Sequence, residues 1–260
     1  PAVVVLVFAM FAYSGMASLS SQILWTRILV FPLGSTLYSF ALILSTFLLG
    51  IAIGSLTANK LLGRSHHVLK FVGIEIAIGV FCIAILPLLG NLTEWTALAD
   101  RYFYSLDPSS GKTFLIRSLF AFGLMFLPTF GFGLLFPLAN HIYSYRFEGV
   151  GKGVGKIMGN TYSVNTVGAV LGTILTPFVF IPLLGIRLSL YVIYSVLILF
   201  GFYILGRVRG FLPLSRVMLL GGVFFILVLG KGFWVPDIET LKAGQGNFTR
   251  LEVNVPQDRI

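Results

Sequence analysis

The sequence predicts an all-α protein, a polytopic membrane helix bundle of about seven transmembrane helices. Of its 260 residues, 57% are hydrophobic and only 10% are charged, whereas soluble domains carry about 25% charged residues. The apolar residues form continuous runs of roughly 20 to 30 residues, and roughly 20 are enough for a helix to span a hydrocarbon core. The runs do not alternate between apolar and polar residues, as membrane β-strands do. We therefore expect a bundle over residues 1–230 and an extramembrane tail over 231–260.

Composition also excludes several other classes of protein. The single cysteine, Cys82, lies inside an apolar run, so no disulfide framework is present. The net charge of +9 comes largely from Lys and Arg at the ends of apolar runs, where the bilayer explains them better than nucleic acid does. The expected partner is therefore the lipid bilayer, and no nucleic acid.

The first three expected helices cover 2–31, 36–62 and 68–89. A turn with Pro32 and Gly34 separates the first from the second. The polar stretch 91–112 follows the third helix. Its aromatic residues, Trp95 among them, suit the depth of the membrane interface, so it predicts a short interfacial helix.

The later helices are expected at 113–145, 154–181, 186–205 and 214–229. The run 113–145 is longer than the bilayer needs and contains Pro128 and Pro137. Proline removes a helical hydrogen bond, which predicts a kinked or broken helix. The helix 154–181 stops before the turn 182–185, which ends in Gly185.

Orientation follows from the Lys and Arg residues of alternate loops, because cytoplasmic loops carry the excess. One set holds Lys60, Arg64, Lys70, Arg146, Lys152, Lys156, Arg207, Arg209 and Arg216 against the single acid Glu148. The other holds Arg27, Arg101, Lys112, Arg117 and Arg187 beside Glu94, Asp100 and Asp107. The first set is expected to be cytoplasmic, in a bacterial inner membrane, with the amino terminus inside and the tail outside. Arg27, Arg117 and Arg187 then lie at the outer face, where long side chains reach lipid headgroups.

Small and polar residues form stripes at helical spacing on three of the expected helices. The stripes are Thr161, Asn165, Gly168, Gly172 and Thr176; Ser39, Thr46, Gly50 and Gly54; and Ser14, Ser18, Ser21, Gln22 and Trp25. One interpretation is close helix packing, since small residues let helix backbones approach. The other is a shared central cavity for a polar ligand.

Glu75 is the one acid expected well within a span, where ionisable groups are rare and mark function. The predicted topology puts it in the cytoplasmic half, so Lys156, His141 or Asn160 is its expected partner. A structural ion pair and a proton or substrate relay both remain open.

No catalytic, cofactor or metal site is predicted within these 260 residues. Neither lysine of the Gly-rich loop 149–156 is followed by Ser or Thr, as a phosphate-binding loop requires. His66 and His67 lack the clustered ligands of a metal site. No nucleophile with a credible base is seen.

Several strings resemble the membrane-embedded part of the spermidine-synthase-like fusion proteins, which join a major-facilitator-like half to a polyamine aminopropyltransferase. They are Gln-Ile-Leu-Trp-Thr-Arg at 22–27, Leu-Gly-Ser-Thr-Leu-Tyr-Ser-Phe at 33–40, Phe-Leu-Leu-Gly-Ile-Ala-Ile-Gly-Ser at 47–55, and Asn-Thr-Val-Gly-Ala-Val-Leu-Gly at 165–172. With Glu75 and Phe136-Pro137-Leu138, the resemblance covers nearly all of residues 10–190. It implies a half-major-facilitator-like bundle followed by a soluble synthase-like domain. The alternating apolar residues of 246–255 are similar to the β-rich opening of that domain.

Three functions follow as expectations. The first is a membrane anchor or ligand-presenting domain of such a fusion protein, with any aminopropyltransferase-like activity in a domain absent from this chain. The second is a transporter half that works as a homodimer, because a six-helix half needs a partner. The third is a structural subunit of a larger membrane complex.

Overall fold

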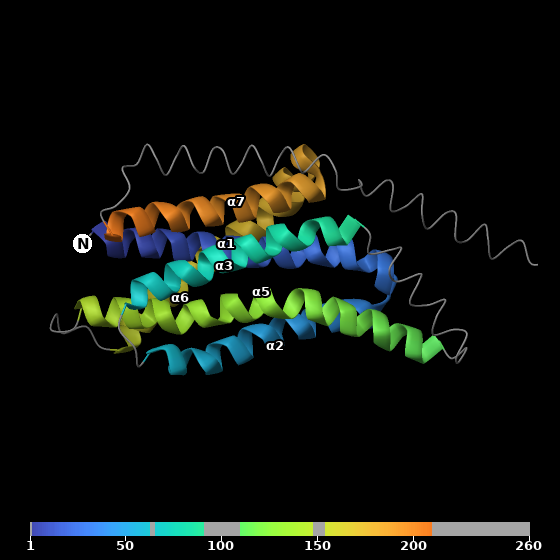
Figure 1. The fold of residues 1–260 in the computed structure, drawn as a ribbon, viewed down its shortest axis with the longest axis horizontal. Coiled ribbons are helices and arrows are strands. Elements are labelled where there is room, and N and C mark those ends of the chain that lie inside the picture. The colour runs from blue at the N-terminus through green and yellow to red at the C-terminus, as the bar shows by residue number, and fades with distance from the viewer. Residues whose placement is uncertain (1, 63–65, 91–109, 148–153, 210–260) are drawn as a thin grey trace, which may run out of the picture.

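The computed structural model describes residues 2–62, 66–90, 110–147 and 154–209, which form six α-helices and one π-helical turn (Figure 1). They are α1 (Ala2–Leu33), α2 (Leu37–Leu62), α3 (His67–Gly90), α5 (Ser110–Phe147), α6 (Val154–Leu175), η1 (Thr176–Phe180) and α7 (Ile181–Arg209). The expected helix 214–229, the tail 231–260 and most of the interfacial stretch 91–112 lie outside the described residues.

Five helical stretches are long and apolar enough to cross a membrane: Val3–Val30, Leu37–Lys60, His67–Pro87, Arg117–Tyr145 and Gly155–Val208. The protein is therefore an integral membrane protein, and the part of it that the structure describes is all-helical. The last stretch has 54 residues, or about 80 Å of helix at 1.5 Å per residue, against a hydrocarbon core of about 30 Å. Its backbone leaves helical geometry at Gly185, where φ is 72° and ψ is 174°, as expected for the turn 182–185.

Contacts with α1 show that the chain reverses within this last stretch. Along α6, Gly168 lies against Ala12 and Gly172 against Met16, so α6 runs parallel to α1. Along α7, Tyr194 bonds Ser21 whereas the later Gly201 lies near the earlier Met10, so α7 runs antiparallel to α1. Helices α6 and α7 therefore run in opposite directions. Contacts of α2, α3 and α5 give the directions of the remaining helices. In the described chain, each helix runs opposite to the described helix before it.

The turn between α1 and α2 is fixed by Gly34 and Thr36. Gly34 has φ of 83°, a conformation that favours glycine, and its N–H donates to the Val30 carbonyl at 2.9 Å. The Thr36 hydroxyl oxygen accepts the Ser39 N–H at 3.2 Å and so caps the first turn of α2. The turn predicted around Pro32 and Gly34 is confirmed.

Of the two outcomes expected for the helix 113–145, a kink or a break, the break does not occur, because α5 continues through both Pro128 and Pro137. Next to the first proline, the Thr129 hydroxyl donates to the carbonyls of Met125 at 2.9 Å and Phe126 at 3.0 Å. These are the bonds that a Thr hydroxyl makes to the preceding helical turn, and the carbonyl that Pro128 leaves without a helical donor is that of Leu124, four residues earlier. The predicted span is confirmed, and the structure shows no break within it.

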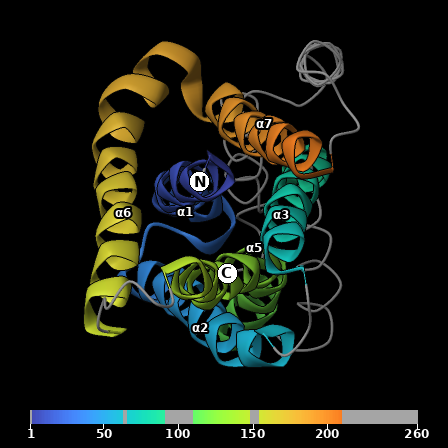
Figure 2. The same cartoon turned by 90° about the vertical axis from the view of Figure 1, so that its left-hand side faces the viewer.

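Helix α1 occupies the centre of the bundle (Figure 2), and it contacts every other helix of the described chain. Small residues such as Ser14, Ala17, Ser18, Ser20 and Ser21 are buried along it. Small side chains let neighbouring backbones approach from several sides. A helix without one polar face is expected at such a buried position.

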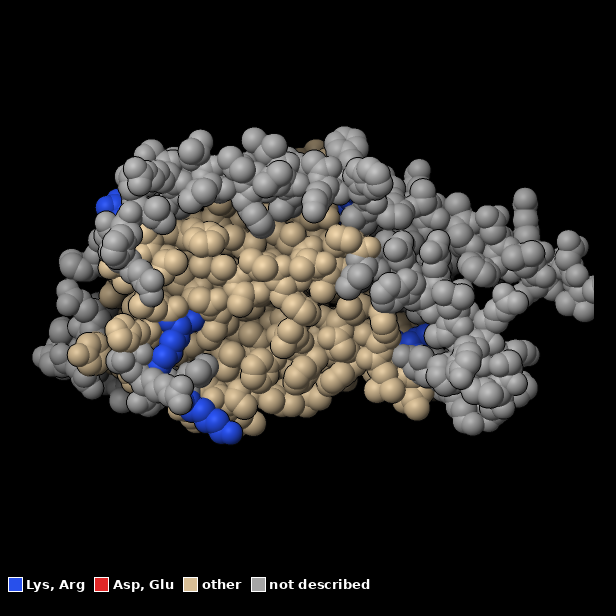
Figure 3. Space-filling view, in the orientation of Figure 1, with Lys and Arg blue, Asp and Glu red and all other residues tan. Residues whose placement is uncertain are grey.

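Large apolar side chains such as Leu48, Leu56, Val167 and Phe178 are exposed on the outside of the bundle. On the face seen in Figure 3, Lys and Arg lie near the two ends of the molecule and leave an uncharged band between them. The helix directions put Lys60, Lys70, Lys156 and Arg207 at one end and Arg27, Arg117 and Arg187 at the other. This separation of cations is the one that the sequence predicted.

Candidate functional site

The small and polar stripe of α6 is a packing surface for α1. A Cβ atom added to Gly168 would overlap the Ala12 carbonyl oxygen, and one added to Gly172 would overlap the Met16 carbonyl oxygen. On α1, a Cβ at Gly15 would overlap the backbone and side-chain oxygens of Asn165. The packing interpretation is thus confirmed for this helix pair.

The stripe of α2 packs in the same way, against α5. A Cβ atom at Gly50 would overlap Thr129, and one at Gly54 would overlap the Phe130 carbonyl. Ser39 and Thr46 are buried, and the Ser39 hydroxyl donates to the Leu33 carbonyl at 2.9 Å. Both stripes hold helices together through these contacts.

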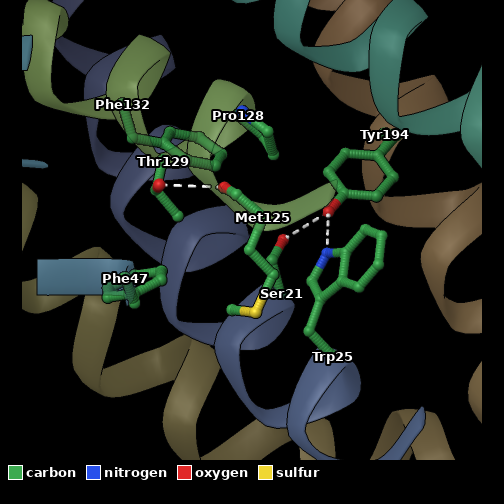
Figure 4. Close-up of a pocket in the computed structure, with 8 residues that line it drawn as sticks. All are labelled: Ser21, Trp25, Phe47, Met125, Pro128, Thr129, Phe132 and Tyr194. Carbon is green, nitrogen blue, oxygen red and sulfur yellow. Dashed lines mark hydrogen bonds between the residues drawn. The ribbon is translucent and has the colours of Figure 1, made fainter. Parts of the chain in front are cut away.

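Polar chemistry inside the bundle centres on Tyr194, which α7 places against α1 (Figure 4). The Trp25 indole N–H donates to the Tyr194 hydroxyl at 3.1 Å, and that hydroxyl donates to the Ser21 hydroxyl oxygen at 2.9 Å. Ser21 in turn donates to the Ala17 carbonyl at 2.5 Å. Each hydroxyl accepts one bond and donates one, so the chain of hydrogen bonds is complete. A fully satisfied buried network of this kind makes a core rigid and specific.

A small cavity adjoins this network. Its volume is about 10 Å³, and it is lined by Ser21, Trp25, Phe47, Met125, Pro128, Thr129, Phe132 and Tyr194 (Figure 4). A cavity needs about 10–15 Å³ to hold a single water molecule, whereas pockets for organic ligands measure about 300–1,000 Å³. The cavity is therefore too small for a polyamine or any other organic ligand.

Glu75 lies at the middle of α3 and is completely buried. The span His67–Pro87 is centred on residue 77, which is two residues or about 3 Å from Glu75. Glu75 therefore lies closer to the middle of the membrane than the sequence suggested. Neither carboxyl oxygen has a hydrogen-bond partner among the described residues, although the Ser14 hydroxyl and Tyr13 of α1 lie beside the carboxyl group. An ionised acid at the centre of a membrane helix costs about 2.5–3.5 kcal/mol on insertion scales.

The partners expected for Glu75 are wrong. Lys156 and Asn160 are exposed on α6, which lies on the other side of α1 from α3 (Figure 2). The Asn160 amide instead donates to the Tyr143 hydroxyl at 3.1 Å. His141 lies at the level where α3 begins, eight residues or about 12 Å along the helix from Glu75. The intervening helix and this axial offset keep all three apart from the carboxyl group.

His141 packs against His67, with ring centroids 4.2 Å apart. This histidine pair joins α5 to the start of α3 and was not predicted, since His67 had been paired only with its neighbour His66. No group of three or more potential metal ligands occurs in the parts of the chain that the structure describes. The pair is therefore two ligands short of the four that a closed structural zinc site has.

The remaining candidates lie apart from one another. Gln22 and Asn165 are half-buried, on α1 and α6. Arg27 is exposed, whereas Arg117 and Arg187 are half-buried at the same end of the bundle. These positions agree with cations that reach towards headgroups, and they bring no cation to Glu75.

Tyr194 is the central residue that sequence reasoning missed. A signal for it was present, because Tyr favours the membrane interface and Tyr194 stands near the middle of Ile181–Arg209. A tyrosine at that depth has to find a hydrogen-bond partner inside the bundle.

No protein-family model, curated protein or solved structure matches this chain.

Proposed function

We propose that this chain is the membrane-embedded helical domain of a spermidine-synthase-like fusion protein, in which it anchors a soluble domain to the bilayer. The close packing of the helix interior carries this proposal. The stripes that might have lined a ligand cavity are used for contacts between α1 and α6 and between α2 and α5, and the cavity beside Tyr194 is about 10 Å³. Such an interior suits an anchor better than a binding chamber.

The resemblance supplies the rest of the proposal. It supports a half-major-facilitator-like bundle of seven crossings in a bacterial inner membrane, with the amino terminus in the cytoplasm. The residues that carry the resemblance include structural ones, since Trp25 belongs to the Tyr194 network and Gly50, Gly54, Gly168 and Gly172 make the closest helix contacts. Any transferase activity towards a polyamine would reside beyond this chain.

The decisive experiment is to sequence the reading frame downstream of the codon for Ile260. An anchor of this family is followed by a Rossmann-type domain with a Gly-rich turn for a nucleoside cofactor and acidic residues for the amine. A stop codon at that point, or an unrelated domain, would refute the fusion proposal. Resistance of the expressed protein to extraction by alkaline carbonate tests the membrane anchor separately.

A transporter half is the second candidate, and the burial of Glu75 favours it, since coupling-ion sites lie near the bilayer midplane. It predicts uptake of labelled polyamine into proteoliposomes that is lost with Glu75→Gln. Uptake equal to that of empty liposomes would remove this candidate and leave the anchor.

A further inference from the structure

Glu75 is the one acidic residue in the part of the chain that the structure describes, since the other eight acids of the sequence lie in undescribed segments. It is completely buried near the middle of its span, where α1, α5 and α7 all contact α3. Complete burial shields an acid at this position from the bulk water that would solvate a negative charge. Its charge state therefore depends on what the neighbouring helices offer.

Among the described residues, no cation is seen beside the Glu75 carboxyl group. Helix α1 presents Ser14 and Tyr13, and the Tyr13 hydroxyl already donates to the Ile193 carbonyl at 2.8 Å. On α5, His141 packs against His67 rather than Glu75. On α3 itself, Lys70 stands five residues earlier, about 140° away around the helix.

Two of the three tyrosines of α7, Tyr194 and Tyr203, make hydrogen bonds elsewhere. Tyr194 lies beside Cys82 and bonds Ser21 and Trp25. Tyr203 accepts a hydrogen bond from Arg207 at 3.3 Å. The backbone level of α7 closest to Glu75 is marked by Gly201, which lies against Ile76.

A metal cation fits this site no better than a fixed positive side chain does. Sodium or calcium would need several oxygen ligands, and in the part of the chain that the structure describes, Ser14 and Tyr13 are the hydroxyl-bearing side chains that interact with the carboxyl group. A proton needs no further ligand. A neutral carboxyl group has one O–H to place, and the Ser14 hydroxyl oxygen can accept it.

We propose that Glu75 is a reversible proton-binding site, and that the closed packing of α1, α3, α5 and α7 is the form in which it holds the proton. Loss of the proton leaves a carboxylate that the closed interior cannot solvate. The deprotonated protein therefore favours an arrangement in which α3 separates from α1 and water reaches Glu75. The helix bundle thereby responds to pH whether or not a soluble domain follows it.

Cys82 provides a natural reporter of this opening. It is the single cysteine of the chain, is completely buried, and lies seven residues after Glu75. Seven residues are about two helical turns, so the two side chains share one face of α3. Opening that exposes Glu75 is expected to expose the Cys82 thiol as well.

The test measures the rate at which N-ethylmaleimide labels Cys82 in the full chain in lipid vesicles as pH is raised. The wild-type rate is divided by the rate for Glu75→Gln, and for Glu75→Leu as a second neutral variant, so that the intrinsic pH dependence of thiol reactivity cancels. Cys82→Ala checks that labelling is specific, and circular dichroism checks that each variant is folded.

The ratio is expected to be close to one at low pH and to rise by up to about tenfold per pH unit once the proton is lost. The neutral variants have no proton to release at this site, so they stay closed. A ratio that is flat over the whole range in which the wild type remains folded would overturn the proposal. An infrared signal showing that Glu75 is already ionised in the closed protein would overturn it equally.

Discussion

Replacing Tyr194 with Phe tests whether the buried hydrogen-bond network stabilises the bundle. The change keeps the ring, which is completely buried, and removes only the hydroxyl group. Trp25 then loses the acceptor of its indole N–H, while Ser21 keeps its bond to the Ala17 carbonyl. A buried donor left without a partner costs about 1–3 kcal/mol, and membrane hydrogen bonds average about 0.6 kcal/mol with a maximum near 1.7.

Tyr194→Phe removes two hydrogen bonds, one to Trp25 and one to Ser21. At the membrane values their loss lowers the free energy of unfolding by about 1–3 kcal/mol, which agrees with the cost of an unpaired buried donor. The folding equilibrium should therefore shift by about 5- to 150-fold. The assay is reversible unfolding by sodium dodecyl sulfate in mixed micelles, followed by far-ultraviolet circular dichroism because Trp25 fluorescence would itself change. Tyr203→Phe on the same helix is the matched control, since its hydrogen bond to Arg207 is exposed and water can replace it. If both variants unfolded at the same detergent fraction, the network would add nothing to stability.

Three further predictions concern packing, the turn and topology. Gly168→Ala should destabilise the protein by about 1–3 kcal/mol, because the new methyl group meets the backbone of α1. Gly159→Ala on the same helix has open space around it and should stabilise the protein by up to about 1 kcal/mol through the higher helix propensity of alanine. Equal effects in the detergent titration would contradict the packing argument. Gly185→Ala should cost about 1–3 kcal/mol through its backbone conformation alone, because φ of 72° with ψ of 174° is a region that glycine adopts almost exclusively and no atom lies within 4 Å of the new group. An unchanged unfolding midpoint would mean that this turn relaxes without strain. In a cysteine-free background, new cysteines at Lys60 and Arg27 should be labelled by an impermeant maleimide from opposite sides of the membrane, and labelling from one side would refute the helix directions.

Much of the fold could be predicted from the sequence, because hydrophobic length is a strong constraint in a bilayer. The boundaries of α1, α2 and α3 lie within two residues of those expected. Gly34 and Gly185 adopt positive φ in the two turns. Glycine adopts such a conformation readily, so both turns could be predicted from the residue type alone. The continuity of α5 through Pro128 could not be predicted in this way, since whether a proline breaks a membrane helix depends on the helices packed around it.

The interior was harder to predict, because the sequence says which faces are small and polar but not which helix meets them. The stripe with Gly168 allowed two interpretations, helix packing or a ligand cavity. Its contact with Ala12 in the structure supports helix packing. Glu75 was recognised as unusual, yet its expected partners lay on a helix beyond α1 or at another depth. The Tyr194 network joins residues at least 169 positions apart, and no local pattern encodes such a distance.

The central place of α1 also bears on how the protein is made. The ribosome synthesises α1 before the other described helices. The hydrogen-bond partner of its Trp25 is Tyr194, which is 169 residues further along the chain and is therefore synthesised later. At about 5–20 residues per second, that interval is on the order of ten seconds. During this time the serines of α1 face lipid, early helices or the insertion machinery instead of their final neighbours. The last helix to dock thus completes the core of the first, so a chain stalled before α7 should be a target for quality control.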